Sequence, residues 1–223
     1  MCGITGIINK EGEDISPKIL KMMTDVISHR GPDGEGHWIE GNTGLGHRRL
    51  AIIDLTKAAN QPMLSDDGRY VLVYNGEIYN YRDIRKELED IGETFRSNSD
   101  TEVLLKSLII WKEQALLKFN GMFSFAFWDR VKKCLLLARD RYGIKPLYYS
   151  FQEKQFIFSS EQKSIFCHPN FKREINKNAL LEYFTFQNIF TSQTLLKGIN
   201  MLPAGHWMKL KTEENNLTIR MYW

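Results

Sequence analysis

The chain begins with MCGITGI (residues 1–7), which places a cysteine directly after the initiator methionine. Cysteine is small enough that this methionine is normally removed, and the new first residue would then carry both a thiol and a free α-amine. Such an amine, with a pKa of roughly 7.7–8.0, can serve as the base that activates the thiol as a nucleophile. The same stretch also fits a short apolar strand with an incidental cysteine, and taken alone it favours that simpler interpretation.

The composition excludes several classes of protein. At 223 residues and 43% hydrophobic content, the chain can bury one large core or two small ones. A net charge of +3 is too small to indicate nucleic acid or a membrane surface as a partner, and no segment matches a membrane span or a signal peptide. The three cysteines (Cys2, Cys134 and Cys167) form no metal-binding pattern. We therefore expect no metal site and a reducing, cytoplasmic setting.

Strand-like and helical patterns occur in groups and not in regular alternation. Strands are expected at residues 2–9, 45–55, 70–75, 195–199 and 205–211 and repeatedly between 121 and 158, and helices at 16–30, 78–92, 99–109, 161–167 and 176–186. Ser16 followed by Pro17, and the capping box SDTE (99–102), indicate two of the helix starts. Residues 31–44 are rich in turn-forming types and predict a loop. This grouping favours an α+β domain in which helices cover antiparallel sheets.

The pair Asn75-Gly76 allows two interpretations. Asn-Gly is the strongest short signal for a hairpin turn, but the residues that follow have helical periodicity and offer no partner strand. At the end of a strand that opens into a loop, the Asn75 carboxamide and the Gly76 N–H could instead point at one developing oxyanion, and glycine would let a substrate approach closely. The spacing favours neither interpretation.

Charged residues within apolar surroundings offer further candidates. Arg48 and Arg49 are adjacent on a predicted strand and must point to opposite faces, so one of them needs a carboxylate from the protein or from an amino-acid ligand. Asp100 is compatible with a simple interaction with the helix dipole or with binding of a substrate ammonium. The histidines are scattered, so each is expected to be structural or solvent-facing: His29, His37, His47, His168 and His206.

Nine motifs taken together resemble one family. They are MCGITGI, HRGPDG, GHRRLAIIDL, NGEIYNY, SDTE, NGMFSFAFWD, RDRYGIKPLYY, FSSEQKS and LPAGH. In this order they resemble the N-terminal domain of glutamine-hydrolysing asparagine synthetases, over essentially the whole chain. This resemblance implies a class II glutamine amidotransferase with the fold of the N-terminal-nucleophile (Ntn) hydrolases, a four-layer αββα sandwich of two antiparallel sheets between helices. HRGPDG with YNGEIYN favours this branch over glucosamine-phosphate synthases and amidophosphoribosyltransferases.

The resemblance also implies how the residues act. Cys2 would be the nucleophile after removal of the methionine, and its own α-amine would take the thiol proton directly or through a water. Asn75 and the Gly76 N–H would stabilise the oxyanion formed when the thiolate attacks the side-chain amide of L-glutamine. Ammonia would then leave, and water would hydrolyse the thioester to glutamate.

Further residues are implied in substrate binding. Arg49 would bind the α-carboxylate of glutamine and Asp100 its α-ammonium, while Leu50, Ile52 and Glu77 match positions that line the pocket of the family. No metal or organic cofactor is expected for this reaction.

The family also has a second domain, which the given sequence does not contain. We expect the amidotransferase domain at residues 1–210 and the start of a connection at 211–223, followed in the intact protein by a synthetase domain that uses ATP and Mg²⁺ to convert aspartate to asparagine. Two alternatives stay open. The same glutaminase chemistry could feed an antibiotic, peptide or surface-polysaccharide acceptor, or the domain could bind glutamine without catalysis. A homodimer is also compatible with the resemblance.

Overall fold

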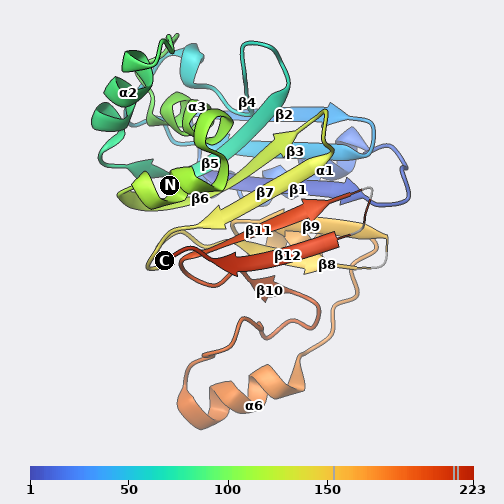
Figure 1. Ribbon diagram of the computed structural model, residues 1–223. Helices are drawn as coiled ribbons and strands as arrows, with labels where there is room; N and C mark the ends of the chain where they lie inside the picture. The colour runs from blue at the N-terminus through green and yellow to red at the C-terminus, as the bar shows by residue number, and fades with distance from the viewer. Residues whose placement is uncertain (153, 213, 215) are drawn as a thin grey trace.

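Two six-stranded antiparallel sheets lie face to face at the centre of the molecule (Figure 1). The computed structural model describes residues 1–152, 154–212, 214 and 216–223. The first sheet has the order β10-β8-β9-β1-β3-β2 and consists of β1 (Gly3–Asn9), β2 (Gly34–Glu40), β3 (Thr43–Arg49), β8 (Tyr148–Phe151), β9 (Gln155–Ser159) and β10 (Asn200–Met201). The second has the order β12-β11-β7-β6-β5-β4 and consists of β4 (Met63–Leu64), β5 (Tyr70–Ile78), β6 (Gly121–Asp129), β7 (Cys134–Arg139), β11 (His206–Lys211) and β12 (Asn216–Met221).

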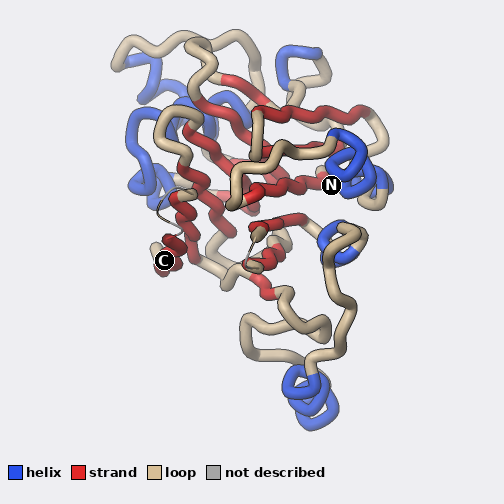
Figure 2. Tube along the Cα trace, turned by 90° about the vertical axis from the view of Figure 1, so that its right-hand side faces the viewer, coloured by secondary structure: helices blue, strands red, loops and turns tan. Residues whose placement is uncertain are grey.

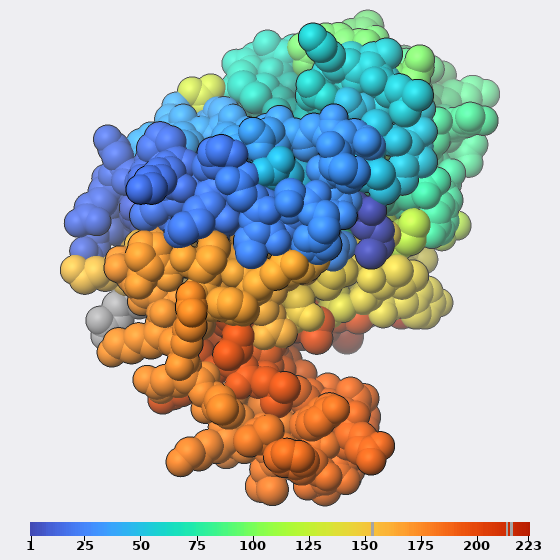
Figure 3. Space-filling view, turned by 180° about the vertical axis from the view of Figure 1, so that it is seen from behind, coloured from blue at the N-terminus to red at the C-terminus, as the bar shows by residue number. Residues whose placement is uncertain are grey.

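Helices cover the outer face of each sheet. On the first sheet these are α1 (Pro17–Asp25) and α5 (Gln162–Phe166), and on the second α2 (Tyr81–Asp90), α3 (Asp100–Trp111) and α4 (Ala115–Lys118). Short 3₁₀ turns occur at η1 (Ser28–Arg30), η2 (Lys57–Ala59) and η3 (Lys112–Gln114). A last helix, α6 (Lys177–Phe186), lies away from the sheets and forms a separate lobe in Figures 2 and 3.

The apolar side chains form three cores that correspond to the spaces between four layers. Ile4 of β1 and Val73 of β5 belong to the core between the two sheets. Leu104 of α3 belongs to the core between the second sheet and its helices, and Leu20 of α1 to the core outside the first sheet. The predicted αββα sandwich is therefore confirmed.

The loop predicted at residues 31–44 is wrong, because most of it forms the edge strand β2 paired with β3. Its glycines suggested turns, but at least one of them is needed for close packing. A Cβ added at Gly36 would lie 2.0 Å from the carbonyl oxygen of Gln61. A glycine selected for close approach cannot be distinguished in sequence from a glycine selected for a turn.

Two other predicted strands have different limits in the structure. The strand expected at 45–55 ends at Arg49, and the apolar residues after it lie in a loop, with Ile52 65% exposed. The strand expected at 195–199 is displaced to β10, and Leu196 pairs with Ile175 in an isolated bridge outside any strand. In both segments the apolar run lies beside a strand and not within it.

The helix starts are largely as predicted, but their caps differ. The Ser99 hydroxyl accepts a hydrogen bond from the Thr101 N–H at 3.1 Å and so caps α3. The reciprocal half of the capping box is wrong, because the Glu102 carboxylate accepts from the N–H groups of Arg96 and Ser97. Ser16 precedes α1 as expected, but its side chain makes no capping hydrogen bond.

The C-terminal residues extend the second sheet. Strand β12 pairs along its length with β11 and forms the edge of that sheet. The division at residue 210 into a domain and a connection stays a prediction. Within the part of the chain that the structure describes, no helix is both long and apolar enough to cross a bilayer.

Candidate active site

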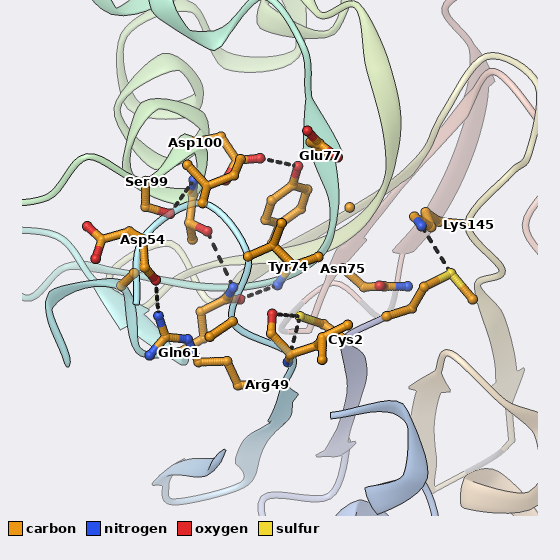
Figure 4. Close-up of a pocket in the computed structure, with 18 of the residues that line it drawn as sticks. Cys2, Arg49, Asp54, Gln61, Tyr74, Asn75, Glu77, Ser99, Asp100 and Lys145 are labelled. Carbon is orange, nitrogen blue, oxygen red and sulfur yellow. Dashed lines mark hydrogen bonds between the residues drawn. The ribbon is translucent and has the colours of Figure 1, made fainter. Parts of the chain in front are cut away.

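One pocket collects every site residue that the sequence predicts (Figure 4). Its lining includes Cys2, Arg49, Leu50, Ile52, Asn75, Gly76, Glu77 and Asp100. These residues come from the segment just before β1, the end of β3 with its following loop, the pocket-facing part of β5 and the first turn of α3. The fold therefore brings together residues that are far apart in the sequence.

Cys2 immediately precedes β1, and its thiol lies against the main chain after β3. The Sγ atom is 3.5 Å from the carbonyl oxygen of Leu50, to which it donates, and 3.4 Å from the Leu50 N–H, which donates to it. Burial raises the pKa of Cys2, and the hydrogen bond from Leu50 only partly opposes this effect. The resting thiol is therefore protonated at neutral pH and needs a base before it can act as a nucleophile.

Asn75 and Gly76 lie inside β5, so the hairpin interpretation is wrong, and so is the expectation that the pair ends a strand. Their partners on β6 are Ser124 and Phe123. Phe123 directs its N–H to the Asp140 carboxylate at 3.1 Å and accepts the Asp140 N–H at 2.8 Å. The Gly76–Phe123 pair is therefore not a hydrogen-bonded pair, and the Gly76 N–H faces away from β6.

The outward side of β5 is the side of the pocket. Along a strand, the N–H groups of every second residue point to the same edge, so those of Tyr74 and Ile78 share an edge with the N–H of Gly76. They donate to the side chains of Gln61 at 2.6 Å and of Asp100 at 3.1 Å. The Gly76 N–H lies between these two, on the same edge of the strand, and so points into the pocket.

The structure also changes the reason for the glycine. A Cβ at Gly76 would lie 2.3 Å from the carbonyl oxygen of Met122 on β6. The close approach that requires glycine is thus to the neighbouring strand. The predicted reason, access for a substrate, is not needed to explain this residue.

The Asn75 carboxamide is buried without a partner. Its side chain is 1% exposed, and among the described residues neither its oxygen nor its nitrogen has a hydrogen-bond partner. Figure 4 shows it in the same pocket as the Cys2 thiol. An unpaired buried amide costs about 1–3 kcal/mol, and such a cost is typical of a group that is kept for a ligand.

Asp100 is held by two donors at the far side of the pocket. Its Oδ2 accepts from the Tyr74 hydroxyl at 2.8 Å and from the Ile78 N–H at 3.1 Å. Burial raises the pKa of Asp100, and these two hydrogen bonds lower it in part. A cation bound beside this carboxylate would favour its ionised form.

The two adjacent arginines separate as the strand geometry predicts. Arg48 makes ion pairs with Asp25 and Glu35 on the outer face of the first sheet. Arg49 faces the pocket and donates to the Thr56 carbonyl at 3.0 Å and, at 2.7 Å, to the side chain of Asn60 in the loop after β3. Arg48 is thus the internal ion pair, whereas Arg49 lines the pocket and has no ion pair among the described residues.

Several residues that support the site were missed from the sequence. Arg30 donates through Nε to the Cys2 carbonyl at 2.9 Å and through Nη1 to Glu161 at 2.9 Å. Lys145 lines the pocket, and Gln61 and Tyr74 connect β5 with α3. The motifs HRGPDG, RYGIKPLYY and FSSEQKS contain Arg30, Lys145 and Glu161, but only the fold shows that they converge on Cys2.

His47 illustrates a structural histidine, as the sequence predicts. It is fully buried, and its Nε2 donates to the Tyr74 carbonyl at 3.2 Å, which links β3 to β5 behind the pocket. Burial lowers the pKa of His47 to about 3, so the ring is neutral. Within the described residues, no group of three or more His, Cys, Asp or Glu side chains could hold a metal ion.

Comparison with known proteins gives concordant matches. The family model described as a glutamine amidotransferase domain matches residues 1–223. The chain is 40% identical to glutamine-hydrolysing asparagine synthetase 3 and 39% identical to asparagine synthetase 1, both of Bacillus subtilis. Each match covers 100% of this chain but only 36% and 35% of the relative, so the chain spans about a third of their length.

A solved structure supports the fold. The glutamine phosphoribosylpyrophosphate amidotransferase of B. subtilis superposes with a TM-score of 0.72 at 19% identity, over 100% of this chain and 49% of that one. At this level of identity the similarity concerns the arrangement of sheets and helices.

Proposed function

This chain belongs to the glutamine amidotransferase domain family, and on that premise we propose that it hydrolyses L-glutamine to glutamate and ammonia with Cys2 as the nucleophile. The observation that carries this proposal is the convergence of the Cys2 thiol, the unpaired Asn75 carboxamide and the Gly76 N–H in one pocket. Arg49 and Asp100 line the same pocket and supply one positive and one negative group. An α-amino acid with an amide side chain complements this set.

Substrate binding uses the two charged groups. The planar guanidinium of Arg49 suits the α-carboxylate of glutamine. The Asp100 carboxylate takes the α-ammonium, and this cation offsets the desolvation that raises the Asp100 pKa. Leu50, Ile52 and Glu77 complete the wall around the bound side chain. The side-chain amide is then directed toward Cys2.

The reaction begins when Met1 has been removed. The α-amine of Cys2, directly or through a water, takes the thiol proton, and the sulfur attacks the amide carbon of the substrate. The Asn75 Nδ2 and the Gly76 N–H donate to the oxyanion of the tetrahedral intermediate. When the C–N bond breaks, the protonated amine gives its proton to the leaving nitrogen, and ammonia departs.

The thioester is then hydrolysed by the same groups. The neutral α-amine takes a proton from water as the oxygen attacks the thioester carbon, and the oxyanion is again stabilised by Asn75 and Gly76. Breakage of the C–S bond returns the proton to sulfur and releases glutamate. These steps use no metal or organic cofactor, and we propose none for this half of the enzyme.

For the intact protein we propose a synthetase domain that follows this one. It would use ATP and Mg²⁺ to activate aspartate and combine it with the ammonia to give asparagine. This is supported by the names and greater length of the B. subtilis relatives. The alternative acceptors, an antibiotic, peptide or polysaccharide, are less favoured by these relatives, and so is a non-catalytic module. A cytoplasmic setting and a homodimer stay predictions.

The test is intact-protein mass spectrometry before and after treatment with a diazoketone analogue of glutamine. We expect loss of Met1 and a single adduct on Cys2, together with release of glutamate and ammonia from glutamine. Cys2→Ala is the matched control and should give neither adduct nor product. Correctly processed, folded protein that binds glutamine but forms no adduct would contradict the proposal and support a binding module.

A further inference from the structure

Lys145 is a buried lysine next to the nucleophile. It lies in the turn after β7, is 4% exposed and lines the pocket with Cys2 (Figure 4). Its Nζ donates to the sulfur of Met1 at 3.1 Å. A thioether is a weak acceptor, so this contact alone does not explain a buried ammonium group.

The carboxylate that acts most strongly on Lys145 is that of Asp140, and it is already used by the main chain. Asp140 accepts the N–H groups of Phe123, Tyr142, Ile144 and Lys145 itself, at 2.9–3.1 Å. Among the described residues, no carboxylate lies within ion-pair distance of the Lys145 Nζ. The positive charge of Lys145 is therefore not neutralised by direct contact.

Several other charged groups act on Lys145 and on Cys2. Burial lowers the pKa of Lys145, and Arg30 lowers it further, whereas Asp140, Cys2 and Glu77 act in the opposite direction. Arg49 and Asp100 act on the Cys2 thiol with opposite signs. These groups come from η1, the segment before β1, β3, β5, α3 and the turn after β7.

Arg30 cannot take over the electrostatic effect of Lys145. Its guanidinium donates to the Cys2 carbonyl and is paired with Glu161. Although burial opposes it, hydrogen bonds from Arg30, Lys163 and His29 lower the pKa of Glu161 to about 2. Glu161 is therefore ionised and offsets the charge of Arg30, whereas no described carboxylate pairs directly with Lys145.

Removal of Met1 exposes this cation to the new N-terminus. The sulfur that contacts Lys145 belongs to the residue whose carbonyl carbon is bonded to the Cys2 nitrogen. When Met1 is removed, that nitrogen becomes a free α-amine at the pocket that the Lys145 side chain also lines. We propose that Lys145 is a positioning residue that keeps the α-amine of Cys2 neutral, and so able to accept the thiol proton, at physiological pH. This inference rests on the proposed function.

The physical basis is repulsion between like charges. A second positive charge in the same pocket destabilises the protonated amine. For a separation of about 8 Å and an effective dielectric constant of about 30–60, this repulsion lowers the pKa of the amine by about half a unit to one unit. The same charge favours the thiolate formed when the proton moves. Both effects favour transfer of the proton from the thiol to the α-amine.

The test compares Lys145→Met with wild-type protein whose N-terminus is shown by mass spectrometry to be Cys2. The acidic limb of the pH profile of kcat/KM for glutaminase should move to higher pH by about half a unit to one unit. Lys145→Arg keeps a positive charge and should restore the wild-type limb. Lys106→Met is the matched control, because Lys106 is also buried but is paired with Glu93 and Asp66 outside this pocket.

Two outcomes separate this inference from the proposed function. A Lys145→Met profile with an unchanged acidic limb, whatever its maximal rate, would overturn the inference. The α-amine is also titrated directly by NMR with isotope-labelled cysteine, which does not depend on turnover, and an unchanged pKa there has the same meaning. Wild-type protein that neither reacts nor hydrolyses glutamine would instead overturn the proposed function.

Discussion

Asn75 lies in the second sheet and Asp140 lies directly after one of its strands; both are buried and polar, but their hydrogen bonds differ. Asp140, directly after β7, is 0% exposed and accepts four main-chain N–H groups. Asn75, inside β5, is 1% exposed, and no described residue pairs with its amide. Asp140 fixes a turn of the main chain, whereas the Asn75 amide is free to bind a ligand.

This difference separates stability from catalysis within one sheet. A buried carboxylate with satisfied hydrogen bonds fixes the backbone around it, so its loss should be felt by the fold. A buried amide without partners makes no hydrogen bond that its removal could break, so its loss should be felt chiefly by the reaction. The two residues therefore predict opposite outcomes for activity and for the free energy of unfolding.

The largest effect on activity is expected at the nucleophile. Cys2→Ala removes the sulfur that forms the thioester and should lower kcat of glutaminase by about 10⁴ or more. The side chain is small and lies at the pocket, so the midpoint of urea unfolding should change little. Glutamine binding, measured by calorimetry, should persist. Substantial residual hydrolysis in this variant would show that another group attacks the substrate.

Asn75→Ala should lower kcat by about 10²–10³, or roughly 3–4 kcal/mol of transition-state stabilisation. The free energy of unfolding should stay within about 1 kcal/mol of the wild-type value, since no hydrogen bond is lost. Ser124→Ala is the matched control, because Ser124 lies opposite Asn75 on β6 and also has an unpaired buried hydroxyl. An Asn75 variant that loses stability and keeps its kcat would reverse the comparison.

Asp140→Ala should show the opposite pattern. Four buried main-chain N–H groups would lose their acceptor, and we expect the free energy of unfolding to fall by about 3–5 kcal/mol, measured by urea denaturation. Asp140→Asn keeps one acceptor oxygen and should lose less. If both variants were as stable as the wild type, water would have to replace the carboxylate, and the turn would not depend on Asp140.

Much of the fold follows from local patterns. Alternating apolar residues in β6 and β7 and the cap at Ser99 predict elements that the structure confirms. The strand β2 was missed because Gly36 is needed for the close approach of Gln61, which lies in a loop remote in sequence. A requirement set by tertiary contact leaves no local pattern.

In the candidate site, too, some residues were predicted from the sequence and others depend on tertiary contacts. The sequence around Cys2 and Arg49 left their roles open, and only the resemblance of nine motifs to one family assigned them. The structure places both residues in the pocket. The contacts of Arg30 and Lys145 could not be foreseen, because each depends on packing between segments more than a hundred residues apart or on the position of Met1. The pair Asn75-Gly76 was ambiguous because the same two residues occur in hairpin turns and within strands. Only the pairing with β6 in the folded protein distinguishes the two.

The smallest effect concerns His47, which joins the pocket strand β5 to β3. Its pKa of about 3 in the folded protein lies below the ordinary value of 6.5, so below pH 6.5 the unfolded chain binds the additional proton. The contribution of His47 to the free energy of unfolding should therefore be fully present above pH 6.5 and fall as the pH decreases toward 3. By about pH 5 the loss should be roughly 2 kcal/mol.

This pH dependence is checked by urea unfolding of wild type and His47→Gln at several pH values. Glutamine does not titrate, so the variant should lose stability less steeply between pH 6.5 and about 5. His37 and His168, whose pKa values are also lowered by burial, are present in both proteins and cancel in the difference. Glu161 contributes only below its ordinary pKa of 4.5. Equal slopes would mean that His47 becomes protonated without leaving the folded state, and the link between β3 and β5 would then not require a neutral ring.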